Sequence, residues 1–292
     1  KFTLLLLSCL LQSCNDGDII VTTFDFSEAS LEACGGVGNY VFFQINSEVK
    51  ESLSLRLKTN DNIYANTDTL SYTLDGTSNF VNYRTYDSAI TNGYFCSSIP
   101  PTSPEVTIDY LGAAGTAVLS KVFNYDDGDN VPEEEEFDGD TDIDGLADLI
   151  DFDDDGDNVP TARELDTENE DGDDNPFTNP KDTDGDGIAD YLDADDDGDG
   201  VPTRYEDANA DLDPTNDATD PAAGPDYLNK DVAITTVVDE YKEHAYTISK
   251  DLNITLKNLV LVNGDEEITE ETLSMGIREN AATEEKKITP TL

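Results

Sequence analysis

Aspartates recur at alternate positions in the middle of this 292-residue chain, and their spacing is typical of ligands for a hard cation. One run begins at Asp140 and a second, with nearly the same pattern, begins at Asp182. A twelve-residue calcium loop needs oxygen ligands at positions 1, 3, 5, 7, 9 and 12, with a residue that tolerates positive φ at position 6. Both runs meet this requirement, with Gly145 and Gly187 at the sharp reversal.

The pattern matches the calcium loop of EF-hands position by position. The ligands predicted for the two runs are Asp140, Asp142, Asp144, the carbonyl of Leu146, Asp148 and Asp151, and then Asp182, Asp184, Asp186, the carbonyl of Ile188, Asp190 and Asp193.

A second type of loop follows each of these runs two residues later. It places a Val carbonyl at position 7, Thr at 9 and a potentially bidentate Glu at 12, and the Pro after the Val keeps the chain extended. The predicted ligands are Asp153, Asp155, Asp157, the carbonyl of Val159, Thr161 and Glu164, and then Asp195, Asp197, Asp199, the carbonyl of Val201, Thr203 and Glu206. We therefore expect four loops in two tandem pairs, 140–164 and 182–206.

Two degenerate copies flank the pairs. The first has Asp127, Asp129 and Glu136 in register, but Tyr125 occupies its position 1. The last, at 226–229, lacks most of the upstream ligands.

The net charge of −50 and the pI near 4.1 constrain the partners of the chain. Most of the acidic residues fall between Asp126 and Asp226, where the carboxylates would repel one another without a cation. Nucleic acid is disfavoured as a partner because its binding depends on Lys and Arg patches. Calcium suits the loops better than magnesium, which prefers a tight octahedral shell that keeps several waters. The alternative is a disordered acidic tract, against which the strict register argues.

The array resembles the thrombospondin type 3 repeats, whose Asp-rich calcium loops also occur in bacterial surface lipoproteins. The resemblance covers residues 125–229 and implies four or more calcium ions that take the place of a hydrophobic core. Only a thin apolar seam, Leu146, Leu149, Ile188 and Leu192, would accompany the ions. The chain departs from the family in having no Cys within the repeats and in the spacer 166–180.

The first residues have the form of a signal peptide. An apolar run, 4–11, follows Lys1 and is too short to span a bilayer. The residues 11–14 resemble a lipobox at the end of the segment 1–14, which predicts that cleavage directly before Cys14 makes it the new first residue and that it is then acylated, whereas Cys9 is a weaker competitor. Acidic residues directly after Cys14 resemble the export signal of lipoproteins on the outer surface of the outer membrane. An ordinary signal peptide is the alternative.

Residues 15–124 predict a β-sandwich-like domain, so the expected fold class is mainly β. The strands are expected at 19–24, 40–45, 52–57 and 106–110, where β-branched and aromatic residues gather between turn residues. With Cys9 removed and Cys14 acylated, two cysteines remain, and an exported protein favours a disulfide between Cys34 and Cys96. Two buried free thiols are the alternative.

Residues 230–280 return to strand patterns. We expect strands at 232–238, 246–248 and 252–256, a hairpin turn at Asn263-Gly264, and a second arm at 268–275. Because so few strands make a poor independent domain, they are expected either to stand as a C-terminal segment or to complete the first domain. The last residues, 281–292, predict a polar tail.

No catalytic motif is evident, and the protein is expected not to be an enzyme. The single His, His244, lies in a polar setting that predicts an exposed position. The leading interpretation is a calcium-binding, lipid-anchored cell-surface protein, with adhesion as one use, in which the repeats form a stiffened spacer or rigid insertion and the β domain contacts a protein partner. The alternatives are an accessory lipoprotein subunit of an outer-membrane complex and a carbohydrate-binding surface module.

Overall fold

The computed structural model describes residues 25–99, 101–133, 135–136, 139–165, 175–176 and 178–291. The signal peptide, the lipidation site Cys14 and the strand expected at 19–24 lie outside the described residues.

The mainly β fold class is confirmed. The strands are β1 (Glu32–Gly36), β2 (Asn39–Asn46), β3 (Glu51–Leu57), β4 (Leu70–Thr73), β5 (Phe80–Tyr86), β6 (Val106–Asp126), β7 (His244–Asn263) and β8 (Glu266–Ile288). They form one curled antiparallel sheet in the order β1-β2-β3-β5-β6-β7-β8, and β4 also pairs with β6. The expected strands 40–45, 52–57 and 106–110 fall within β2, β3 and β6.

The C-terminal strands complete the first domain. β7 pairs with β6 over most of its length, and its alternating apolar residues enter the same core as those of β2, β3 and β5. The period of two places Leu252, Ile254 and Leu256 on the inner face, beside Phe42 and Leu55. The hairpin turn at Asn263-Gly264 is confirmed, because β7 ends at Asn263 and Gly264 has φ +62.

The disulfide between Cys34 and Cys96 is confirmed. It joins β1 to the short helix α1 (Gly93–Cys96), with the two Cα atoms 5.5 Å apart. Next to it, Phe95 stacks on Phe43 of β2 with ring centroids 4.4 Å apart. The bond therefore holds the segment after β5 against the edge of the sheet.

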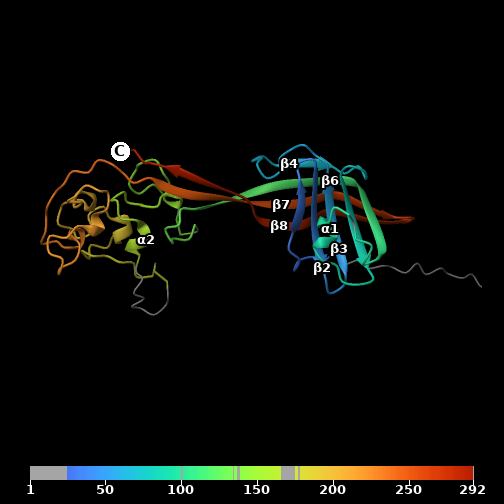
Figure 1. The fold of residues 1–292 in the computed structure, drawn as a ribbon, viewed down its shortest axis with the longest axis horizontal. Helices are drawn as coiled ribbons and strands as arrows, with labels where there is room; N and C mark the ends of the chain where they lie inside the picture. The colour runs from blue at the N-terminus through green and yellow to red at the C-terminus, as the bar shows by residue number, and fades with distance from the viewer. Residues whose placement is uncertain are drawn as a thin grey trace, which may run out of the picture.

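Three strands extend beyond the core as a ribbon that carries the acidic repeats. Figure 1 shows β6, β7 and β8 running from the curled sheet to a second, mostly irregular body. The chain enters this insertion after Asp126 and leaves it at His244, and Asp126 pairs with Thr247 in the ribbon. The repeats are thus an insertion between two paired strands of one sheet. Its regular elements are η1 (Asp148–Ile150), α2 (Thr161–Glu164), η2 (Asp190–Leu192), η3 (Thr203–Tyr205), η4 (Pro214–Asn216) and η5 (Asp226–Leu228).

Two sequence-based expectations are wrong in this part of the chain. Residues 232–238 form no strand, because they return along the repeats and bond to them individually, as when the Thr236 N–H donates to the Tyr205 carbonyl at 2.6 Å. The polar tail expected at 281–292 is strand as far as Ile288, because β7 continues to His244 and offers its backbone as a partner. Polar side chains suit this ribbon because most of β8 faces solvent.

Candidate metal centre

Five loops of the insertion reverse at position 6 with a left-handed residue. The φ angles are +76 at Asn130, +97 at Gly145, +73 at Asn158, +100 at Gly187 and +95 at Gly200. The predicted reversal is therefore confirmed in all four regular loops and is present in the first degenerate copy as well. Gly and Asn occupy these positions because they adopt positive φ at the lowest cost.

In each loop, aspartate side chains accept a hydrogen bond from a backbone N–H group with one carboxylate oxygen. Asp142 accepts the Asp144 N–H at 2.9 Å, and Asp155 accepts the Asp157 N–H at 3.3 Å. The position-5 Asp of each regular loop accepts the N–H of the position-7 residue, at 2.7 Å for Leu146, 2.6 Å for Val159, 2.8 Å for Ile188 and 2.8 Å for Val201. The second oxygen is left for another partner.

Those second oxygens gather where a cation would lie. Buried and without a hydrogen-bond donor are Oδ2 of Asp127, Asp129, Asp142, Asp155, Asp157, Asp197 and Asp199, Oδ1 of Asp153, Asp154 and Asp195, and carboxylate oxygens of Glu136, Glu164, Asp196 and Glu206. Such groups are costly to bury alone, and a bound metal ion satisfies them.

Several groups of these side chains can hold a metal ion. Ligand oxygens lie within 4.8 Å of one another in the groups Asp127/Asp129/Glu136, Asp140/Asp142/Asp144, Asp155/Asp157/Glu164/Asp196, Asp182/Asp184/Asp186 and Asp195/Asp197/Asp199. The predicted ligands at positions 1, 3 and 5 are thus brought together in three loops. The first degenerate copy forms a group as well.

The acids at position 9 turn toward the loop's own backbone. Asp148 accepts both the N–H and the hydroxyl of Thr141, at 2.9 and 3.0 Å, and Asp190 holds Thr183 in the same way at 2.7 Å each. Lys181 also pairs with Asp190 at 2.6 Å. In calcium loops this position often reaches the ion through water. The position-9 hydroxyls of Thr161 and Thr203 likewise accept backbone N–H groups, from Asp154 and Asp196.

The last copy keeps this scaffold without the ligands. Thr219 donates its N–H and hydroxyl to Asp226, at 2.7 and 2.9 Å, as in the two complete loops. η5 then follows as η1 and η2 do. The repeat fold is therefore encoded by the Thr–Asp contact as well as by the ligands.

The residues at position 12 differ between the two loop types. Glu164 and Glu206 are buried with both carboxylate oxygens unpartnered. Asp193 accepts the Asp195 N–H at 3.0 Å, and Asp151 lies 2.8 Å from Nδ1 of His244. The glutamates are thus the side chains that stand ready for bidentate ligation.

Crowding in a dry interior strongly affects these acids. Burial, followed by the charges of Asp129 and Glu136, raises the pKa of Asp127 to about 9. Burial, followed by the charges of Asp129 and Asp148, raises the pKa of Asp154 to about 10. The pKa of Glu164 lies well above its ordinary value, because it is buried and close to other carboxylates. A divalent cation would offset the same repulsion.

The two loops of each pair pack in the same way. A Cβ on Gly156 would lie 2.2 Å from Oδ2 of Asp142, and a Cβ on Gly198 would lie 2.2 Å from Oδ2 of Asp184. Glycine at position 4 of the second loop therefore lets its backbone approach a ligand of the first.

His244 is buried at the joint between ribbon and insertion, so its predicted exposed position is wrong. It is 1% exposed, its ring meets Phe152 edge-on, and it pairs with Asp151. Burial lowers the pKa of His244, but the hydrogen bond and charge of Asp151 outweigh it, and the pKa is raised. Sequence patterns missed this position because its partner lies far away in the chain.

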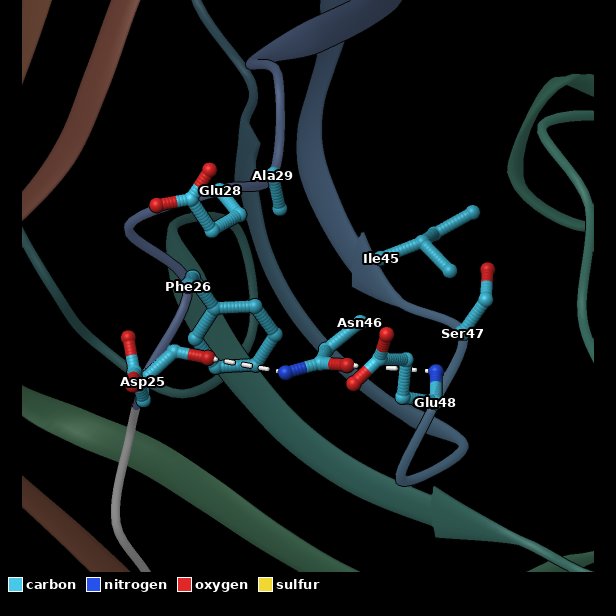
Figure 2. A pocket seen from close by; sticks show the side chains of 8 residues that line it. All are labelled: Asp25, Phe26, Glu28, Ala29, Ile45, Asn46, Ser47 and Glu48. Carbon is cyan, nitrogen blue, oxygen red and sulfur yellow. Dashed lines mark hydrogen bonds between the residues drawn. The ribbon is translucent and has the colours of Figure 1, made fainter.

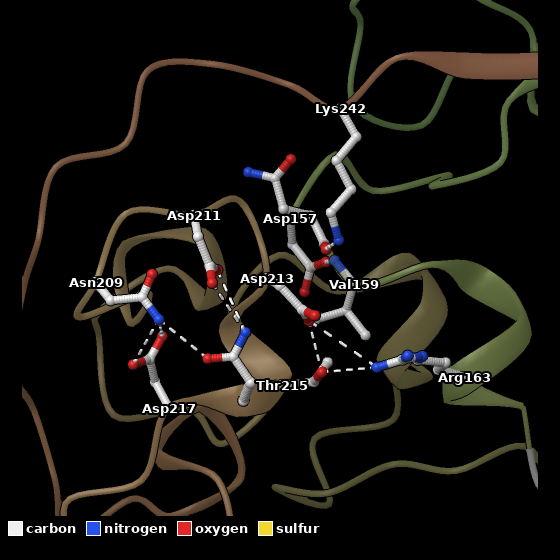
Figure 3. A network of polar contacts seen from close by, with 11 residues as sticks. Asp157, Val159, Arg163, Asn209, Asp211, Asp213, Thr215, Asp217 and Lys242 are labelled. Atoms are coloured by element: carbon white, nitrogen blue, oxygen red, sulfur yellow. Dashed lines mark hydrogen bonds and ion pairs between the residues drawn. The ribbon is translucent and has the colours of Figure 1, made fainter.

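The returning segment ties the insertion to the ribbon at further points. The Lys242 ammonium donates to the Asn158 carbonyl at 2.5 Å, and the Asn158 amide donates to the Glu240 carbonyl at 3.1 Å. Figure 3 shows Lys242 beside Asp157 and Val159, near the network in which Arg163 reaches Thr215 at 2.7 Å. In the same network, Asn209 and Asn216 join the acids at 211 and 217. The first pair is thereby linked both to the segment that follows the second pair and to the returning segment before β7.

Sequence reasoning left Asp154 and Asp196 without a role. Both occupy position 2 of the second loop type, both are buried, and Asp196 belongs to the group around Glu164. A signal was present, because position 2 is Thr in both loops of the first type and Asp in both of the second.

The β domain contains a pocket beside the end of β2. Figure 2 shows Asp25, Phe26 and Asn46 on its wall, where the Asn46 amide donates to the Asp25 carbonyl at 3.0 Å. Its lining contains no His, Cys, Lys or Arg. The chemistry therefore concentrates in the insertion.

Within the described part of the chain, no helix is both long and apolar enough to cross a membrane. Comparisons of the chain with protein-family models, with curated proteins and with solved structures found no match.

Proposed function

We propose that this chain is a calcium-binding, lipid-anchored protein of the outer cell surface. In this proposal, ions order the inserted repeats and the β domain contacts a protein partner. The observation that carries the proposal is the set of buried, unpartnered carboxylate oxygens that converge in loop after loop. The resemblance to thrombospondin type 3 repeats supports the same conclusion.

Calcium is the ion that the donor set favours. The candidate ligands are carboxylate, hydroxyl and backbone carbonyl oxygens, and these suit hard cations. Glu164 and Glu206, with both oxygens unpartnered, can each bind through two oxygens, which suits the larger calcium shell of six to eight ligands. The role of the ions is structural in this proposal, and the protein is not an enzyme.

The described chain begins at the end of the sheet opposite the insertion. Asp25 bonds to Asn46 at the end of β2, and the register of β2, β3 and β5 places that end level with the start of β6. The insertion follows the other end of β6, which is 21 residues long. At about 3.3 Å per residue, β6 separates the two ends by roughly 60 Å. This separation supports a proposal in which the start of the chain and the repeats lie at opposite ends of the sheet.

Counting bound calcium tests the proposal. The acylated protein, purified from membranes and dialysed against calcium, should carry four or more ions in native mass spectrometry, and a chelator should remove them. Magnesium at equal concentration should not replace them. Binding of no calcium would contradict the proposal. Cys14→Ser tests the anchor separately, since it should release the protein from membranes without changing the ion count.

A further inference from the structure

One group of acids is assembled from both tandem pairs. It contains Asp155, Asp157 and Glu164 of the second loop and Asp196 of the fourth, and their ligand oxygens lie within 4.8 Å of one another. Helix α2, which carries Glu164, packs against η2 of the second pair. Two segments separated by the spacer therefore meet at this point.

The carboxylates of this group lack protein partners. Glu164 is 1% exposed and Asp196 is 2% exposed, and both oxygens of each are without a hydrogen-bond donor. Asp155 and Asp157 each spend one oxygen on a backbone N–H and direct the second, Oδ2, to no donor. Four buried carboxylates in such proximity are unfavourable unless a cation binds among them.

The backbone around Asp196 aims it away from its own loop. Its N–H donates to the Thr203 hydroxyl at 3.2 Å, while its neighbours Asp195 and Asp197 join the group of the fourth loop. Tyr227 of the last copy is buried near the shared group, since burial and then the charges of Glu164 and Asp196 raise its pKa. Asp196 is thus held in a closed site on the second loop.

The equivalent acid of the first pair has a similar environment. Asp154, at the equivalent position of the second loop, is buried with Oδ1 unpartnered, and the largest charge effect on its pKa comes from Asp129 of the first degenerate copy. That earlier loop has Tyr125 at position 1 in place of a carboxylate. In both pairs, position 2 of the second loop type is therefore a buried carboxylate with an unpartnered oxygen.

We propose that Asp196 is a calcium ligand of the second loop, together with Asp155, Asp157 and Glu164, and that this ion joins the two tandem pairs. The inference rests on the proposed calcium-binding function. The ion at this site has four carboxylates and no exposure to solvent, so it is expected to be among the last that a chelator removes. Loss of the site separates the pairs without removing any ligand predicted for the fourth loop.

Paired substitutions test whether Asp196 is a ligand of the second loop or of its own loop, the fourth. We would count calcium by native mass spectrometry in the full chain carrying Asp196→Asn, Glu164→Gln, Glu206→Gln, and Asp196→Asn combined with each glutamate change. If Asp196 serves the second loop, Asp196→Asn with Glu164→Gln loses one ion, no more than either single change. Asp196→Asn with Glu206→Gln then loses two.

The reverse pattern would overturn the shared site: two ions lost when Asp196→Asn is combined with Glu164→Gln, and one when it is combined with Glu206→Gln. An unchanged ion count in all variants would overturn it as well. A wild-type chain that binds no calcium would instead contradict the proposed function itself. Asp231→Asn, an exposed acid, is the matched control and should keep every ion.

A second measurement does not depend on removing a ligand. The chain has no Trp, so terbium placed at calcium sites is sensitised by tyrosines alone. Tyr227→Phe keeps all four carboxylates and should reduce the luminescence of the tightest terbium site several-fold without changing the ion count. Luminescence that is unchanged would overturn the placement of the ion beside Tyr227.

Discussion

The sheet and the insertion differ in the chemistry of their interiors. In the sheet, most of the buried side chains, such as Phe42, Leu55 and Ile254, are apolar. In the insertion, buried side chains such as Asp157, Glu164 and Asp196 are acidic. Apolar burial stabilises a fold in water directly, whereas buried acids do so only when a proton or cation accompanies them. The stability of one region is therefore intrinsic, and that of the other is conditional.

The backbone shows the same difference. Strand ladders satisfy the N–H groups of β2 to β8, but in the loops aspartate side chains accept many of them. Each such Asp both shapes its loop and presents an oxygen for a cation. Ion binding and backbone conformation are consequently coupled in the insertion. The conformation of the sheet does not depend on an ion.

The largest expected effect is a loss of sheet stability that does not depend on calcium. Ile254→Ala removes a fully buried side chain of β7 and should lower the free energy of unfolding of the sheet by about 2–5 kcal/mol, with or without calcium. Urea denaturation followed by far-ultraviolet circular dichroism measures it. Ile277→Ala is the control, since Ile277 on β8 is 51% exposed and should cost under about 0.5 kcal/mol. If the loss of unfolding free energy caused by Ile254→Ala depended on calcium, the sheet and the insertion would not be stabilised independently.

The stability of the insertion should change with pH in opposite directions with and without calcium. The pKa of Glu136 is raised to about 8 by burial and then by the charge of Asp129, and that of Asp127 to about 9. The folded insertion then binds more protons than the unfolded one between about pH 4 and pH 9, so without calcium its stability falls as pH rises through that window. With calcium, acidification displaces ions and the stability falls as pH drops. Melting curves in chelator and in calcium from pH 4 to 9 measure this, and parallel pH profiles would contradict it.

A pair of glycine substitutions tests the packing between loops. Gly198→Ala and Gly185→Ala each place a side chain at position 4 of a loop, with φ of +65 and +79, and each carries about 1–2 kcal/mol of backbone strain. Only the Cβ at 198 meets Asp184, because nothing lies within 4 Å of a Cβ at 185. Calcium titration should show Gly198→Ala to bind at least about tenfold more weakly than Gly185→Ala. Equal affinities would mean that the loops of a pair do not depend on each other.

The smallest effect concerns charge in the sheet. Arg84 of β5 and Asp109 of β6 form an ion pair at 2.9 Å that is partly exposed. Arg84→Met should cost less than about 1 kcal/mol, because exposed pairs contribute little. Thermal unfolding at low and high salt measures it, and a loss comparable to that of Ile254→Ala would show that the sheet, too, depends on charge.

Local patterns predicted much of this structure. Alternating residues placed β2, β3 and the hairpin at Asn263-Gly264, and loop spacing placed the left-handed residues and the ligand groups of positions 1, 3 and 5. These features depend on neighbours within a dozen residues, so the sequence carries them directly.

What the sequence could not predict depends on contacts between distant segments. Asp196 had no predicted role and lies in a ligand group of the second loop, and His244 was expected to be exposed and is buried beside Asp151. The strand at 281–288 exists because β7 runs beside it. The strand expected at 232–238 is absent because the repeats take its hydrogen bonds instead.

Hydrogen–deuterium exchange with and without calcium tests the central difference most directly. A chelator should raise exchange many-fold in the loops at 139–165 and 182–206 while β2, β3 and β5 keep their protection, and calcium should restore the loops. Loops that stay protected in chelator, or a sheet that loses protection together with them, would contradict the conclusion that cations hold the insertion and an apolar core holds the sheet.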